Sequence, residues 1–126
     1  MNKLVKTCKK EDLYFEFLKA LNGIIDLPKR ELELLHLLVK LQLNPKLSGN
    51  DEDENVISGI NRKYITKELG ITPDNQSRYY NKFKELGYLV RGKVDKQWLV
   101  NKILIPEVIR DRIQITIILK FKDEEN

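Results

Sequence analysis

Apolar side chains recur at helical spacing in two segments near the N-terminus of the chain. In residues 11–25 they fall three and four positions apart, and two acidic residues stand in front, where the helix dipole favours them. In residues 28–42 leucines cover such a wide arc that we expect this helix at the centre of the fold, with Pro28 in its first turn. The pattern therefore predicts a pair of N-terminal helices, preceded by a basic arm over residues 1–10.

A second pair of helices is predicted over residues 60–87. The first of them spans residues 60–69, and Gly70 then supplies the positive φ that a tight helix exit needs. Thr72 is placed to cap the second helix, and Pro73 occupies its first position. Two helices that are joined by a glycine turn of about four residues form a helix-turn-helix.

Two further patterns predict strands. Short apolar triplets on either side of a polar turn predict a β-hairpin over residues 88–100. Apolar and polar residues alternate through residues 112–121, which predicts a longer C-terminal strand. Because Ile118 lies on the otherwise polar side of this strand, an exposed edge would favour aggregation. We therefore expect the strand to join the hairpin of its own chain or to pair with another subunit.

The composition fits one globular domain. The chain has 126 residues, of which 41% are hydrophobic and 33% charged. We expect a mostly helical α+β domain over residues 11–126. No apolar run approaches the roughly 18 residues of a membrane span, and no apolar stretch follows the basic N-terminus as it would in a signal peptide. We therefore expect a cytoplasmic protein without a membrane partner.

Catalytic and metal chemistry find little support in the sequence. Cys8 and His36 are the only cysteine and histidine, so the usual Cys/His zinc sites cannot form. We find no glycine-rich phosphate loop and no nucleophile with a base at a recognisable spacing. The sequence predicts no enzymatic activity, no catalytic residues, no cofactor and no metal site.

Positive charge is concentrated in one part of the chain. The whole chain has a net charge of +4. Residues 62–96 alone hold nine basic and four acidic residues, whereas the remainder is slightly acidic. This balance permits a polyanionic partner and places it at the predicted helix-turn-helix and hairpin.

A series of short motifs in this basic region matches a known pattern. The motifs are Ile65, Leu69-Gly70-Ile71, Thr72, Ser77-Arg78-Tyr79 and Leu86-Gly87-Tyr88. Together with the hairpin they resemble the winged helix-turn-helix DNA-binding family over about residues 58–100. The resemblance implies a winged-helix domain with an N-terminal helix pair and an added C-terminal strand.

The resemblance also implies a DNA-binding surface. In the family the second helix of the motif enters the major groove, where arginine can bind guanine and asparagine can bind adenine. Basic residues of the hairpin would contact phosphate or the minor groove. Carried over to this chain, the DNA-binding residues are Asn75, Ser77, Arg78, Asn81 and Lys82 on the helix and Arg91, Lys93 and Lys96 on the hairpin.

Two residues depart from the family pattern. Gln76 stands where an apolar side chain is usually buried, and Thr66 replaces a small alanine. A buried amide without partners costs about 1–3 kcal/mol. We therefore expect either a rotated second helix or an outward-facing Gln76. Tyr80 and Phe83 are expected in the core.

Two functions follow from these observations. The first is a DNA-binding regulator of transcription or replication that contacts duplex DNA with residues 73–86. The second is a non-enzymatic structural or interaction subunit on a winged-helix scaffold, for example a component of a phage particle, which would place the protein in a virion. Gln76, the acidic run 51–54 and the predicted strand 112–121 favour the second. In either case we expect a homo-oligomer or a larger assembly formed through that strand.

Overall fold

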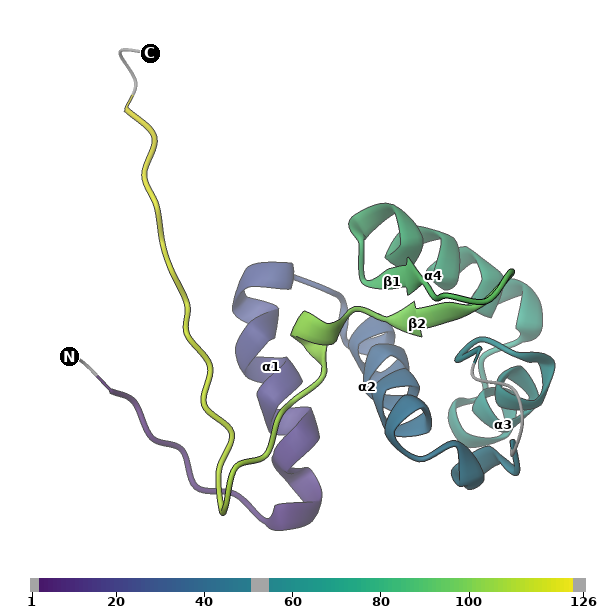
Figure 1. Ribbon diagram of the computed structural model, residues 1–126, viewed down its shortest axis with the longest axis horizontal. Helices are drawn as coiled ribbons and strands as arrows, with labels where there is room; N and C mark the ends of the chain where they lie inside the picture. The colour runs from purple at the N-terminus through teal and green to yellow at the C-terminus, as the bar shows by residue number, and fades with distance from the viewer. Residues whose placement is uncertain (1–2, 51–54, 124–126) are drawn as a thin grey trace.

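The computed structural model describes residues 3–50 and 55–123, so the acidic run 51–54 lies outside the described residues. Within these ranges the chain forms four α-helices and a two-stranded antiparallel sheet (Figure 1). The expected mostly helical α+β class is confirmed. The helices are α1 (Leu13–Ile25), α2 (Lys29–Leu43), α3 (Gly59–Leu69) and α4 (Pro73–Leu86). Short 3-10 turns are η1 (Lys10–Asp12), η2 (Pro45–Ser48) and η3 (Lys102–Leu104).

Helix α2 lies at the centre of the fold, as its leucine-rich sequence predicts. It contacts α1, α3 and strand β2, and Figure 1 shows α1 and α3 on opposite sides of it. Leu34, Leu35 and Leu38 are fully buried along α2. Each such side chain contributes roughly 1.5–3 kcal/mol relative to an exposed one. Burial around α2 therefore joins the N-terminal helix pair to the rest of the chain.

The helices α3 and α4 begin and end where the sequence predicts. The hydroxyl of Ser58 accepts a hydrogen bond from the Asn61 amide and caps α3, and Thr72 caps α4 in the same way. Gly70 and Gly87 follow the two helices with φ of 69° and 79°. Only glycine adopts this left-handed conformation without steric cost, so both helices stop at these points.

The hairpin is formed by β1 (Leu89–Arg91) and β2 (Trp98–Val100). Leu89 pairs with Val100, and Arg91 pairs with Trp98. The other edge of β2 is partly covered, because the Val56 amide donates to the Trp98 carbonyl at 3.0 Å. The hairpin thus lies directly after α4 and receives one backbone hydrogen bond from the segment that precedes α3.

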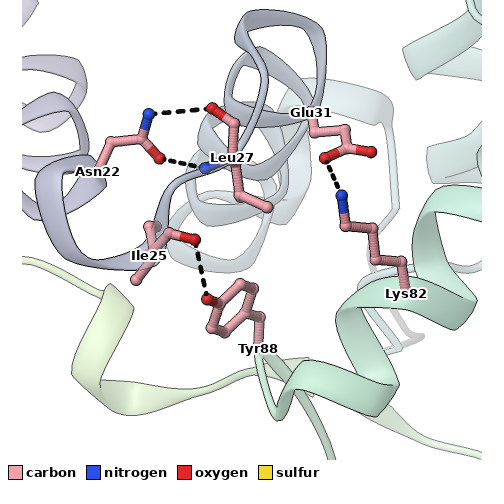
Figure 2. A network of polar contacts seen from close by, with 6 residues as sticks. All are labelled: Asn22, Ile25, Leu27, Glu31, Lys82 and Tyr88. Atoms are coloured by element: carbon pink, nitrogen blue, oxygen red, sulfur yellow. Dashed lines mark hydrogen bonds and ion pairs between the residues drawn. The ribbon is translucent and has the colours of Figure 1, made fainter.

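Polar contacts connect the corner between α1 and α2 with the second helix pair (Figure 2). The Asn22 side chain closes this corner, because its Nδ2 donates to the Leu27 carbonyl at 3.0 Å and its Oδ1 accepts from the Leu27 backbone N–H at 2.8 Å. The Tyr88 hydroxyl donates to the Ile25 carbonyl at a long 3.5 Å. Lys82 on α4 forms a 2.7 Å ion pair with Glu31 at the start of α2. The corner is therefore held from α4 and from the residue before β1.

The expected strand over residues 112–121 is not formed, and this prediction is wrong. The chain turns at an isolated bridge between Ile109 and Arg112 and then continues as extended chain without secondary structure. Figure 1 shows this yellow-green segment projecting away from the helices. A strand needs a neighbour to pair its backbone groups, and β1 and β2 have only three residues each. They are too short to pair with a strand of this length.

Candidate nucleic-acid interface

Helix α4 has one buried and one exposed side. Gln76, Tyr80 and Phe83 are buried, which confirms the expectation that Tyr80 and Phe83 belong to the core. The opposite side is open to solvent. Its exposed residues are Asp74, Asn75, Arg78, Asn81, Lys82, Glu85 and, at the end of the helix, Leu86.

Gln76 does not face outward, which corrects that expectation. Its side chain is fully buried and hydrogen-bonded at both ends. The amide nitrogen Nε2 lies 2.9–3.0 Å from the carbonyls of Arg62 and Ile71 and from the hydroxyl of Thr66. The oxygen Oε1 accepts a 2.7 Å hydrogen bond from the Tyr80 hydroxyl. The amide therefore avoids the cost of an unsatisfied buried group.

The two departures from the family pattern compensate each other. Thr66 bonds to Gln76, and its hydroxyl also lies 2.8 Å from the Ile71 carbonyl. A polar pair thus occupies the space between α3 and α4 where the family pattern has an apolar side chain and an alanine. Each residue departs from the pattern when it is considered alone. The occurrence of both in the same chain is the sequence signal that could have predicted a buried hydrogen bond between them.

Three of the predicted helix residues are available to a ligand. Asn75, Arg78 and Asn81 are exposed, and their side chains form no hydrogen bond or ion pair among the residues described. Asp74 and Glu85 are exposed on the same side of α4. The outward side is therefore polar and mixed in charge rather than strongly basic.

The other two predicted helix residues are engaged within the chain. Lys82 is paired with Glu31, whose side chain is only 11% exposed. The hydroxyl of Ser77 is half-buried and accepts a 2.8 Å hydrogen bond from the Arg62 guanidinium. These residues hold α4 against its neighbours, so they contribute less to a ligand surface than the sequence predicts.

The predicted hairpin residues lie at its exposed end. Lys93 and Lys96 are exposed in the turn, where Lys96 adopts a left-handed φ of 62°. The side chain of Gln97 folds under the turn and accepts a hydrogen bond from the Val94 amide at 3.1 Å. Arg91 is also exposed, and its guanidinium lies 5.0 Å from the centroid of the Trp98 ring.

Lys84 and Arg62 belong to this surface although the sequence did not single them out. The Lys84 ammonium lies 4.4 Å from the centroid of the Trp98 ring. Burial lowers the pKa of Lys84, and the positive charges of Arg62 and Arg91 lower it further. The three cations therefore form a cluster at the junction of α3, α4 and the hairpin. Sequence spacing alone cannot reveal it, because the residues come from three elements.

A hollow away from this surface lies between α1, α2 and the end of α3. It has a volume of about 480 Å³ and is open to solvent. Its wall includes His36, whose ring contacts Phe15 at a centroid distance of 4.9 Å. Burial and the nearby charge of Lys40 lower the pKa of His36 to about 4. This histidine is therefore a neutral, half-buried side chain at the edge of the core, as expected for its position in a leucine-rich helix.

Comparison with known proteins adds no family to this geometry. No family model, no curated protein and no solved structure matches the chain. Among the described residues, no helix has the length and apolar character needed to cross a membrane. Within the same ranges, no three histidine, cysteine or carboxylate side chains gather into a possible metal site. The function must be inferred from the residues and charges of the chain itself.

Proposed function

We propose that this protein is a regulator of transcription or replication that binds duplex DNA, using α3, α4 and the hairpin as a winged helix. The order of elements supports this proposal: two capped helices joined at Gly70 are followed directly by a hairpin. The hydrogen bond between Val56 and Trp98 also attaches the segment before α3 to the hairpin, so the motif is held together at both ends.

The observation that carries the proposal is the open side of α4. Arg78 and Asn81 project from a helix whose opposite side is fixed in the core by Tyr80 and Phe83. An arginine can bind the O6 and N7 atoms of guanine, and an asparagine can bind the N6 and N7 atoms of adenine. A rigid helix with these groups exposed suits the major groove, which admits an α-helix.

The distribution of charge suits phosphate contact by the hairpin rather than by the ends of α4. Asp74 and Glu85 lie near the two ends of the exposed side of this helix and would repel phosphates there. Lys93, Lys96 and Arg91 of the hairpin offer cations to the backbone beside it. In this arrangement α4 contacts bases, whereas the hairpin contributes most of the phosphate contacts.

The proposal is tested by a mobility-shift assay on mixed-sequence duplex DNA over a range of salt concentrations. We expect the affinity to fall steeply with salt, because each phosphate contact releases counterions and adds about −0.9 to the slope of log affinity against log salt. The double variant Arg78→Ala/Asn81→Ala should lose binding. Lys40→Ala, which removes one exposed charge from α2, is the matched control and should bind as the parent does.

Two results would contradict this function. The first is the absence of a shift for the parent at low salt. The second is equal DNA affinity of the Arg78→Ala/Asn81→Ala variant and the Lys40→Ala control, because DNA binding would then not use the exposed side of α4.

The C-terminal segment supports a second candidate, a structural or interaction subunit. Residues 114–123 are exposed, and among them Ile118, Leu119 and Phe121 have 73%, 85% and 95% of their surface open to solvent. An extended segment of this composition can add to a partner sheet. Light scattering on the full chain tests this candidate. A defined oligomer that is lost when residues 114–126 are removed would favour it, whereas a monomeric full chain at micromolar concentration would contradict it.

A further inference from the structure

We propose that Lys84 and Arg91 bind a phosphate group of the nucleic-acid backbone beside the Trp98 ring, in the corner between α4 and the hairpin. This inference rests on the proposed DNA binding and assigns one phosphate contact to a defined place on the surface. Neither Lys84 nor Trp98 was among the residues that the family resemblance implied.

The geometry brings two cations to one aromatic side chain. The Lys84 ammonium is 4.4 Å and the Arg91 guanidinium 5.0 Å from the centroid of the Trp98 ring. Arg91 and Trp98 are paired across the hairpin, and Lys84 reaches them from the last turns of α4. Contact with an aromatic ring restricts both long side chains, so less conformational entropy remains to be lost when a ligand binds.

A third cation lies behind the first two. Arg62 on α3 is fixed by hydrogen bonds to the Ile57 carbonyl and the Ser77 hydroxyl at 2.9 and 2.8 Å. Its guanidinium lies 5.0 Å from the centroid of the Tyr80 ring. Arg62 is close enough to Lys84 to lower the pKa of its ammonium. The positive field at Lys84 therefore comes from a fixed arginine as well as from the hairpin.

None of these three cations is neutralised by a carboxylate in the described part of the chain. The ion pairs found there involve Lys6, Lys19, Lys82 and Arg112 instead. Burial lowers the pKa of Lys84, and repulsion from the like charges of Arg62 and Arg91 lowers it further. An anion bound between Lys84 and Arg91 would remove the repulsion.

The chemistry of the cluster matches a phosphate. Arginine offers a planar fork of N–H donors and lysine a compact charge, and this combination is common in phosphate recognition. Because the Trp98 ring contacts both cations, we assign it the role of positioning them rather than of stacking on a base.

Trp98 also provides a direct measurement, because it is the only tryptophan in the chain. Its fluorescence is titrated with inorganic phosphate and, separately, with a short mixed-sequence duplex. An anion that draws the two cations away from the ring should change the emission with both ligands, saturably, and at much lower concentration for the duplex. The variants Lys84→Gln and Arg91→Gln are compared with Lys40→Gln as the matched control, after circular dichroism has shown that all are folded.

The expected result is a loss of the emission change in Lys84→Gln and Arg91→Gln and its retention in Lys40→Gln. In the mobility-shift assay, each of the two variants should also make the negative slope of log affinity against log salt shallower by about one.

The possible results distinguish a failure of the phosphate site from a failure of the proposed DNA binding. If the duplex binds through Arg78 and Asn81 but Trp98 emission does not respond and Lys84→Gln binds as the parent does, the phosphate site is overturned and DNA binding stands. If the duplex does not bind but inorganic phosphate changes the emission in a Lys84-dependent way, the nucleic-acid source is overturned, and the site serves a free phosphate. If the duplex does not bind in the mobility-shift assay and neither ligand changes the emission, both are overturned.

Discussion

Thr66 and Gln76, ten positions apart in the sequence, meet between α3 and α4, where the Gln76 amide donates to the Thr66 hydroxyl at 2.9 Å. The same amide nitrogen contacts the carbonyl of Arg62 within α3 and the carbonyl of Ile71 in the turn. One buried side chain of α4 thus bonds both to α3 and to the connection between the helices. The angle between α3 and α4 is fixed by directional hydrogen bonds in addition to apolar packing.

We expect Gln76→Ala to lower the free energy of unfolding by about 1–3 kcal/mol, because the Tyr80 hydroxyl loses its partner and two backbone carbonyls each lose one of their donors in a buried place. Urea denaturation followed by circular dichroism measures this change. The effects of Thr66→Ala and Gln76→Val should not add in the double variant, with a coupling of about 1 kcal/mol. Strict additivity would show that the two residues do not act as a pair.

We expect Lys82→Ala to destabilise the fold by about 1–2 kcal/mol, because it leaves the Glu31 carboxylate largely buried and without its cation. The matched control is Lys63→Ala on α3, since Lys63 is exposed and forms no ion pair among the described residues. It should change the stability by less than about 0.5 kcal/mol. Equal stability of the two variants in thermal denaturation would argue against a structural role for Lys82.

The protein should become less stable as the pH falls from about 6.5 to about 4 because of His36. Burial and the charge of Lys40 hold the pKa of its imidazole near 4 in the folded chain, below the ordinary 6.5. The unfolded chain therefore binds the extra proton in this range, and the stability present above pH 6.5 is lost toward pH 4. We expect a loss of about 1 kcal/mol, reduced by solvent screening at the half-exposed ring.

The contribution of His36 is isolated by comparison with His36→Gln in denaturant melts across the same pH range. Glu33 and Glu68 line the same hollow and are present in both proteins, so their contribution cancels in the comparison. The difference in stability between parent and variant should therefore change with pH. A constant difference would contradict the assignment.

Removal of residues 114–126 should leave the helical fold intact. Every described residue after Ile113 is exposed. Ile113 itself packs against the core and is kept in the truncated chain. We expect the free energy of unfolding of the truncated chain to lie within about 0.5 kcal/mol of the parent value, measured by thermal denaturation at low protein concentration. A large loss of stability would show that this segment contributes to the fold of a single chain.

Local signals in the sequence predicted most of the fold. Thr72 and Gly70 mark helix ends through their own backbone chemistry, and the leucine spacing of residues 28–42 places α2 at the centre. The prediction of a C-terminal strand was wrong because the alternation of apolar and polar residues indicates only which side chains could face a core. A strand also needs a neighbouring strand long enough to pair with it. Local pattern contains no information about that partner.

The candidate site was predictable only in part, because the exposed side of α4 follows from helical spacing but the partners of its residues do not. Lys82 and Glu31 are 51 positions apart, and Lys84 reaches a tryptophan on another element. The family resemblance assigned Lys82 to DNA binding and left out Lys84, whereas in the structure Lys82 pairs with Glu31 and the Lys84 ammonium lies over the Trp98 ring. A long side chain can reach several neighbours, and the arrangement of the helices and strands determines which neighbour it contacts.

The corner between α1 and α2 gives α4 a mechanical connection to the far end of the molecule. The Glu31–Lys82 ion pair and the Tyr88–Ile25 hydrogen bond both cross from this corner to the α4 side of the fold. A ligand that tilts α4 has to stretch one of them or carry α1 along. A displacement of α4 would therefore also act on the end of α1 and on the start of α2.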